Sequence, residues 1–187
     1  MESFSSSENV DFEVRNMKSR VSVRFITEGA VIAALYVALT LIFAPFSFSA
    51  VQVRIAEALA ILPMFTFTAV PGLFLGCIIA NLLGGAIAWD VIFGSLATLI
   101  GAAIGYQLRA NRWLVPIPTV ISNALIIPLV LRYGYGVNLP VPLLIVYIAV
   151  GEFLGSYLLG ELLGTVLLRY GKRLFRRHEE SDVKRKD

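Results

Sequence analysis

Cysteine and histidine are almost absent from this sequence, and their scarcity excludes several classes of protein. The one cysteine, Cys77, cannot form an intramolecular disulfide, and the one histidine, His178, lies in a basic tail far from any co-ligand. A structural zinc site is therefore not expected. The lone histidine also leaves no Ser–His or Cys–His pair for nucleophilic catalysis.

Nucleotide-hydrolysing motifs are missing as well. The sequence contains no G-x-x-x-x-G-K-[ST] phosphate loop and no H-E-x-x-H metalloprotease motif. The chain thus has no visible means of hydrolysing ATP, and we expect neither an enzyme nor a bound cofactor. One catalytic alternative stays open, in which paired carboxylates inside a membrane perform the chemistry.

Charged residues are scarce in the middle of the chain. Hydrophobic residues make up 57% of the sequence, and the mean hydropathy of +0.77 is too high for an ordinary soluble protein. We therefore expect the chain in a lipid bilayer. Between residues 25 and 168 the charged side chains are Glu28, Arg54, Glu57, Asp90, Arg109, Arg112, Arg132, Glu152 and Glu161.

Six apolar segments approach the roughly 20 residues that a helix needs to cross the hydrocarbon core. Pro71 and Gly72 link the short third segment tightly to the second, so these two could form one bent element. We predict an all-α, polytopic membrane protein with six transmembrane helices in one domain. An N-terminal cytoplasmic tail, expected to be disordered, and a basic C-terminal tail flank this domain. The tails are 1–24 and 173–187, the domain is 25–172, and the spans are 25–43, 51–68, 70–83, 90–108, 114–131 and 142–169.

The distribution of basic residues predicts the orientation of the spans. Lys and Arg near span ends are retained on the cytoplasmic side. Six spans with cytoplasmic N- and C-termini leave only Arg54 and Arg132, of 16 basic residues, on the outer side. An odd number of spans would place the basic C-terminal tail outside. This tail is expected to contact membrane lipid head groups, not nucleic acid.

Small residues recur at four-residue spacing, and in lipid such residues let helix backbones approach closely. The first span carries the longest stripe, Ala30, Ala34 and Ala38, on one helix face. This stripe could receive a helix of a partner protein. The glycine pairs, expected mainly at contacts within the chain, are Gly72 and Gly76, Gly101 and Gly105, Gly151 and Gly155, and Gly160 and Gly164.

Polar residues within or at the ends of spans are functional candidates, because an unpaired ionisable group costs several kcal/mol in lipid. Counted from the span ends, six such residues lie toward the outer half of the membrane. With the aromatic residues Trp89 and Tyr147 they would form an outward-facing pocket for a small, flat, polar molecule, cationic or rich in hydrogen-bond donors. The six are Arg54, Glu57, Asn81, Asp90, Asn123 and Glu152.

Most of these residues also have a structural interpretation. Arg54 and Glu57, three residues apart, could neutralise each other at the lipid surface. Asp90 could cap the helix that follows it, and Asn81 and Asn123 could form hydrogen bonds between helices.

Glu152 has the weakest structural interpretation. No basic residue lies within one helical turn of it. It therefore needs a partner from another span, a proton or a ligand.

Distinctive stretches follow one another along residues 25–172: "EGAVIAALYVALT", "QVRIAEAL", "PGLFLGCIIANLLGG", "WDVIFGSLATLIGA", "SNALIIPLVL" and "GEFLGSYLLG". In this order and spacing they resemble the substrate-binding S components of energy-coupling factor (ECF) transporters, specifically the QueT family of queuosine-precursor transporters. The charged N-terminal 24 residues and the long basic C-terminal tail depart from the family's pattern.

The resemblance implies a six-helix protein of the bacterial cytoplasmic membrane that captures its substrate from outside. It implies docking onto a transmembrane coupling subunit, driven by two cytoplasmic ATPases, through the stripe Ala30, Ala34 and Ala38. It also implies a 7-deazaguanine base, such as 7-aminomethyl-7-deazaguanine, as cargo. The alternatives are an S component for another flat vitamin, thiamine- or folate-like, and a ligand-free structural or assembly subunit.

The chemistry of this implied cargo suggests a role for each polar residue. The pairing edge of the base has two N–H donor groups and a carbonyl, and its arm is cationic. A carboxylate can accept from both donors, and an amide can donate to the carbonyl. We expect Glu152 and Asn123 to recognise the base edge, and Asp90 or Glu57 to neutralise the arm. Arg54 would orient Glu57, and Asn81 would make a supplementary contact. Trp89 or Tyr147 would stack on the base.

Overall fold

A computed structural model describes residues 3–44 and 54–170, with side chains from residue 23 onward. These residues form helices and no strand, which confirms the all-α class. Two elements, η1 and η2, are 3₁₀ helices, and two others, η3 and η4, are π turns. The elements are α1 (Ser3–Ile42), η1 (Ile55–Met64), α3 (Ala69–Leu83), α4 (Ala88–Gln107), η2 (Arg112–Leu114), α5 (Ile117–Leu129), η3 (Val130–Gly134), α6 (Val141–Glu152) and η4 (Phe153–Leu158).

Four helical stretches within the described residues are long and apolar enough to cross a membrane: Val23–Ile42, Ala88–Gln107, Arg112–Gly134 and Val141–Tyr170. The multi-pass membrane character is therefore confirmed. The expected second and third spans are shorter than a full crossing. With 10 and 15 residues, η1 and α3 measure only about 20 and 22 Å, less than the roughly 30 Å hydrocarbon core.

The short helix η1 is the central element of the bundle. It packs against α1, α3, α4 and η4, and its apolar residues Ala56, Leu59 and Ile61 are buried. A 3₁₀ helix of ten residues is uncommon because its hydrogen bonds are poorer than those of an α-helix. Tertiary packing, rather than intrinsic propensity, therefore stabilises η1.

Glycines allow the helices to approach one another, as the four-residue spacing predicted. A Cβ atom built on Gly76 of α3 would lie 2.8 Å from Cβ of Tyr36 on α1, and one on Gly101 of α4 would lie 2.6 Å from the backbone of Thr119. No side chain fits at such distances without a shift of the neighbouring helix. These glycines are therefore used at contacts within the chain.

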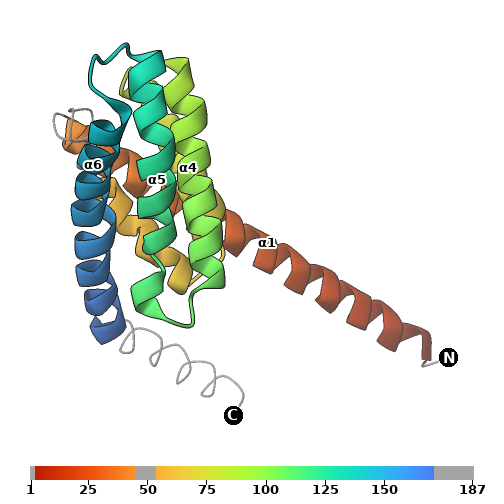
Figure 1. Cartoon of the computed structure of the whole chain (residues 1–187). Helices are drawn as coiled ribbons and strands as arrows, with labels where there is room; N and C mark the ends of the chain where they lie inside the picture. The colour runs from red at the N-terminus through yellow and green to blue at the C-terminus, as the bar shows by residue number, and fades with distance from the viewer. Residues whose placement is uncertain (1–2, 45–53, 171–187) are drawn as a thin grey trace.

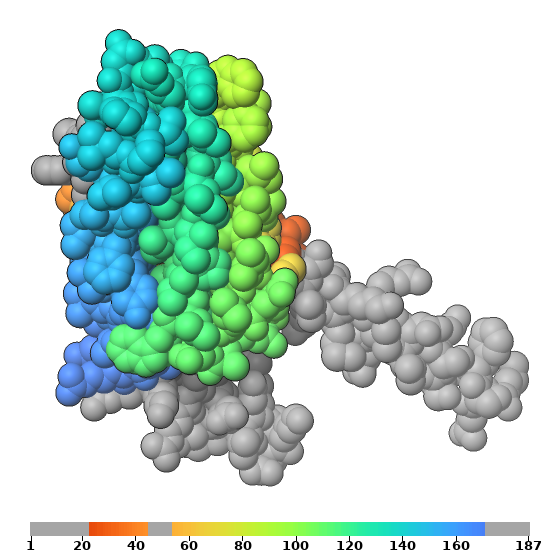
Figure 2. Space-filling view, in the orientation of Figure 1, coloured from red at the N-terminus to blue at the C-terminus, as the bar shows by residue number. Residues whose placement is uncertain are grey.

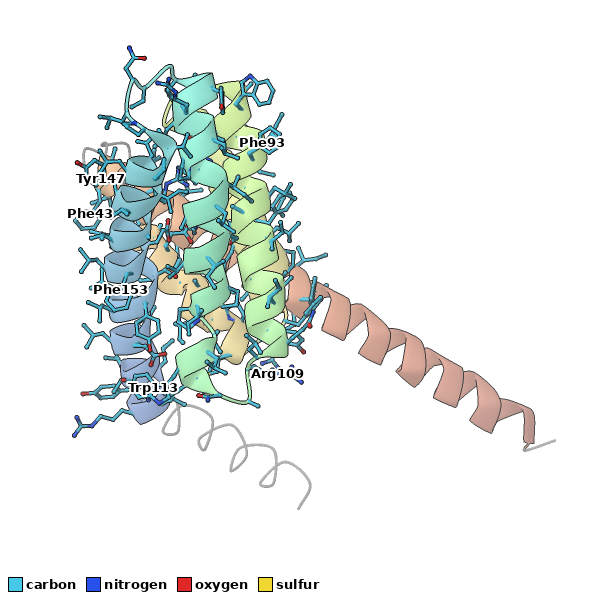
Figure 3. The ribbon with its side chains drawn as sticks, in the orientation of Figure 1. Phe43, Phe93, Arg109, Trp113, Tyr147 and Phe153 are labelled. Atoms are coloured by element: carbon cyan, nitrogen blue, oxygen red, sulfur yellow. The ribbon has the colours of Figure 1, made fainter. Side chains whose placement is uncertain are left out.

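The helices alternate in direction through the bundle. The start of α1, the α4–α5 connection and the end of the α6 helix lie toward the same end (Figure 1). Arg109 and Trp113 mark this end in Figure 3. In Figure 2, the side chains of α4, α5 and α6 form one closed face of the molecule. The arrangement agrees with termini on one side of the membrane, and which side that is stays a prediction.

The ends of the chain bear on two further expectations. Helix α1 begins at Ser3, within the segment that was expected to be a disordered tail, and the assignment of residues 1–24 to a tail stays a prediction. The basic tail at 173–187 lies outside the described residues.

An ion pair joins the α4–α5 connection to the last helix. Nε of Arg112 donates to Oε2 of Glu161 at 3.0 Å, and Nη2 of Arg112 donates to the hydroxyl of Thr165 at 2.8 Å. Glu161 is 7% exposed. This carboxylate therefore has a structural partner near the end of the bundle that holds the α4–α5 connection.

Candidate substrate site

Six buried polar residues from five elements gather inside the bundle, and we call them the polar cluster. Each is at most 3% exposed. The end of α3 and the start of α4, which supply two of them, lie at the end of the bundle away from the termini (Figure 1). The cluster consists of Arg54 and Glu57 at η1, Asn81 of α3, Asp90 of α4, Asn123 of α5 and Glu152 of α6.

The partner of Arg54 is Asp90, which corrects two expectations. Nη2 of Arg54 lies 3.6 Å from Oδ2 of Asp90, and both side chains are buried. The expected pair of Arg54 with Glu57 at the lipid surface is therefore wrong, because the ion pair joins η1 to α4 inside the protein. No side chain caps α4, so the hydrogen-bonded cap expected of Asp90 is wrong, but its position in the first turn suits the helix dipole as expected.

Tyr135, from the loop after η3, completes the surroundings of Asp90. Its hydroxyl donates to Oδ2 of Asp90 at 3.2 Å and accepts from the backbone N–H of Ile87 at 3.3 Å. Partial burial is the main cause that raises the pKa of Tyr135 above its ordinary value, and the negative charge of Asp90 adds to it. The phenol is therefore protonated at neutral pH and acts as a donor. The contacts from Arg54 and Tyr135 both reach Oδ2, whereas Oδ1 of Asp90 is buried without a hydrogen-bond partner in the described structure.

Glu57 is held through one of its two oxygens. Its Oε1 accepts from the hydroxyl of Tyr36 on α1 at 2.5 Å and from the hydroxyl of Thr98 on α4 at 3.5 Å. Within the described part of the chain, no donor bonds to the other oxygen, Oε2. The carboxylate is therefore oriented through Oε1 by hydroxyl groups of α1 and α4.

The two asparagines of the cluster differ in their surroundings. Nδ2 of Asn81 donates to the backbone carbonyl of Asp90 at 3.3 Å and to Sγ of Cys77 at 3.6 Å. Asn81 therefore joins α3 to α4, as its structural interpretation predicts. Both polar atoms of the Asn123 side chain are buried without a hydrogen bond of acceptable geometry in the described structure, although the amide lies close enough to Glu152 of α6 to interact with its carboxylate.

Glu152 lies beside the Asn123 amide, and one of its carboxylate oxygens has no hydrogen-bond partner in the described structure. Its side chain is a neighbour of Asn123 and lies within electrostatic range of Glu57 and Arg54. Among the described residues, however, its Oε2 has no hydrogen bond of acceptable geometry. Each buried polar atom left unpaired costs about 1 to 3 kcal/mol. Such a cost is explained if these atoms face a ligand.

Sequence reasoning missed several residues of the site. Tyr36, Thr98 and Tyr135 all contact carboxylates of the cluster, but hydroxyls in membrane helices commonly serve packing and carry no distinctive sequence signal. Ser156 is fully buried, and its Oγ has no partner in the described part of the chain. It follows Glu152 by four residues within the π turn η4, and π turns are frequent at functional sites.

The two aromatic candidates lie outside the cluster or on another helix face. Trp89 is 58% exposed and stacks on Phe93 with ring centroids 5.4 Å apart, as is common for tryptophan at a membrane interface. The exposure of this ring does not favour its expected stacking role, which stays a prediction. Tyr147 is half-buried and precedes Glu152 by five residues, which places it about 140° around α6 from Glu152.

The π turn η4 packs closely against the backbone of Arg54. A Cβ atom built on Gly155 would lie 2.7 Å from the carbonyl oxygen of Arg54. We expect Gly155→Ala to lower stability by about 1 to 3 kcal/mol, because the added methyl group forces η4 and η1 apart. Thermal unfolding measures this as a fall of about 2 to 4 °C per kcal/mol.

Gly160→Ala is the matched control for this prediction. A Cβ atom there would lie 3.3 Å from the carbonyl oxygen of Ala58, so a small adjustment accommodates it. Equal unfolding temperatures for the two variants would contradict the close contact at Gly155.

The alanine stripe lies on the outside of the bundle, away from the polar cluster. Ala30, Ala34 and Ala38 are exposed, and they line an apolar groove of about 680 Å³ between α1 and α3. Leu75 and Ile79 of α3 form part of its other wall. We call this feature the α1–α3 groove. No group of three potential metal ligands occurs among the residues described.

Comparison with known proteins gives one match. The family model described as QueT transporter matches residues 26–169. No curated protein and no solved structure matches the chain at a significant level. The matched segment contains the whole polar cluster and the alanine stripe.

Proposed function

The chain belongs to the QueT transporter family, and we propose that it is the substrate-binding S component of an ECF transporter for a queuosine precursor. In this role it captures a 7-deazaguanine base, such as 7-aminomethyl-7-deazaguanine, from outside a bacterial cell. A transporter in a membrane is consistent with the four long apolar helices found among the described residues. The carrying observation is that the Asn123 amide and Oε2 of Glu152 are buried without a hydrogen-bond partner among the residues described.

The charges of the cluster favour a cationic ligand. Three buried carboxylates, Glu57, Asp90 and Glu152, surround one buried guanidinium, Arg54. Arg54 and Asp90 compensate each other at 3.6 Å. Two carboxylates therefore need a cation, hydrogen-bond donors or protons, because an uncompensated charge is costly inside a protein.

The chemistry of the cluster supports an assignment of ligand groups. Glu152 accepts hydrogen bonds from the two donors on the base edge, and the Asn123 amide donates to the base carbonyl. Glu57 is assigned to the cationic arm through Oε2, the oxygen that Tyr36 and Thr98 do not contact. Asp90 has the weaker claim to this arm because Arg54 already compensates its charge, although its Oδ1 has no partner in the described structure.

Energy and docking come from partner subunits in this proposal. The sequence has no phosphate loop, so hydrolysis of ATP belongs to two separate cytoplasmic ATPases. The α1–α3 groove receives a helix of the transmembrane coupling subunit. Exposure of Ala30, Ala34 and Ala38 in this apolar groove supports this assignment, because small residues allow close helix contact in lipid.

Ligand-induced stabilisation tests the proposed function. Purified protein in detergent is heated with 7-aminomethyl-7-deazaguanine, guanine, thiamine or folate. At 100 times its Kd the deazaguanine base should stabilise the fold by about 2.7 kcal/mol, more than the other compounds at equal concentration. A larger effect of thiamine or folate would indicate another vitamin as cargo. No effect of any compound would favour a structural subunit.

A further inference from the structure

We propose that Tyr36 is a positioning residue that links occupancy of the polar cluster to the α1–α3 groove. This inference rests on the proposed function, since it joins the proposed cargo site to the proposed docking surface. Tyr36 is 1% exposed, and its hydroxyl donates a 2.5 Å hydrogen bond to Oε1 of Glu57. It is the residue through which α1, the helix that carries the alanine stripe, contacts a carboxylate of the cluster.

The same turn of α1 forms part of the groove. Ala33, Ala34 and Val37 flank Tyr36 in the sequence, and all three line the groove. Their positions place the phenol of Tyr36 on the inner side of the helix and the wall of the groove beside it. A displacement of this turn therefore changes the groove directly.

Close packing prevents the Tyr36 side chain from absorbing such a displacement alone. A Cβ atom on Gly76 of α3 would lie 2.8 Å from Cβ of Tyr36 and 3.1 Å from the backbone of Ala33. The base of the side chain is thus confined against α3, and its far end is confined by Glu57. Because packed interiors respond by moving whole elements between arrangements, a shift of Glu57 is passed to α1.

A cationic ligand supplies the cause of this shift. Tyr36 and Thr98 both bond to Oε1 of Glu57, and the ligand cation binds at Oε2. It draws negative charge away from Oε1 and weakens the bond from Tyr36. The interaction between α1 and Glu57 then differs between the empty and the occupied site, which is the differential interaction that a population shift requires.

Two substitutions separate this link from a general loss of binding. Tyr36→Phe and Thr98→Val each remove one hydroxyl donor from the same oxygen of Glu57, but Thr98 belongs to α4. A bimane fluorophore attached at Ala34→Cys reports on the groove, because Cys77 is fully buried and escapes labelling. A label at Leu35→Cys, an exposed position outside the groove lining, is the control.

The titration uses 7-aminomethyl-7-deazaguanine at saturating concentration for each variant, with Kd measured by calorimetry. We expect the ligand to shift bimane emission at position 34 and not at position 35. The shift should persist in Thr98→Val and vanish in Tyr36→Phe, although Tyr36→Phe still binds with about tenfold weaker affinity, since it loses one hydrogen bond to a charged group.

Several results would overturn the link. Among the variants, these are equal emission shifts in Tyr36→Phe and Thr98→Val, or loss of the shift in both. In the parent protein, they are ligand binding without a shift at position 34, or with equal shifts at positions 34 and 35. The comparison of positions 34 and 35 does not depend on the folding of either variant. Absence of calorimetric binding by the unsubstituted protein would contradict the proposed function itself, and with it the link.

Discussion

Glu152→Gln is expected to weaken the binding of 7-aminomethyl-7-deazaguanine by about 100-fold. Glu152 is 3% exposed, and its Oε2 has no hydrogen-bond partner in the described part of the chain. Glutamine keeps the size of the side chain but removes the charge and turns one acceptor into a donor that faces the donors of the base. Loss of a charged contact in a buried site costs at least about 2 kcal/mol, and 100-fold corresponds to about 2.7 kcal/mol.

Glu161→Gln is the control for this measurement. Glu161 is a buried carboxylate further along the same helix, but it accepts a hydrogen bond from Arg112 at 3.0 Å. Its substitution should lower the unfolding temperature and leave the affinity unchanged. Calorimetric titration and thermal unfolding of both variants give the comparison. If Glu152→Gln binds as tightly as the unsubstituted protein, Glu152 is not part of the site.

Ala34→Trp is expected to abolish uptake in cells while the purified variant still binds its cargo. Ala34 is exposed and lines the α1–α3 groove. An indole ring at this position occupies space that a partner helix needs for close backbone contact, and such contact drives helix association in lipid. The polar cluster lies inside the bundle and should be unaffected. Accumulation of labelled cargo in cells and calorimetry on the purified protein measure the two properties separately.

Leu35→Trp distinguishes a blocked groove from a general effect of a large residue on α1. Leu35 is 49% exposed and does not belong to the groove lining. This variant should support normal uptake. Normal uptake by Ala34→Trp, or an equal loss in both variants, would contradict docking at the groove.

The helical content and membrane location of the chain follow from the sequence, because hydropathy is a sum over residues along a segment. The sequence did not reveal that the second apolar segment contains a 3₁₀ helix of only ten residues, η1. Its apolar residues satisfy the hydropathy criterion for a membrane span equally well in an α-helix and in a 3₁₀ helix. The choice between them depends on packing against α1, α3, α4 and η4, which a count along the segment cannot include.

The polar candidates were recognisable for a similar reason. A carboxylate or amide inside an apolar segment is costly wherever its neighbours lie, so Glu152 and Asn123 could be selected from the sequence. Their burial and their unpartnered atoms agree with that selection. The sequence could not decide the role of Trp89, because aromatic residues suit both a stacking site and the membrane interface, and its 58% exposure places it on the surface.

The sequence by itself thus determined that this is a helical membrane protein with costly polar groups in its apolar segments. The tertiary structure alone decided how those groups pair: Arg54 with Asp90, Tyr36 with Glu57, and Glu152 with no donor at its Oε2 in the described part of the chain. The physical reason is that transfer into lipid is a property of each residue, whereas pairing depends on atoms that different helices bring within hydrogen-bond distance.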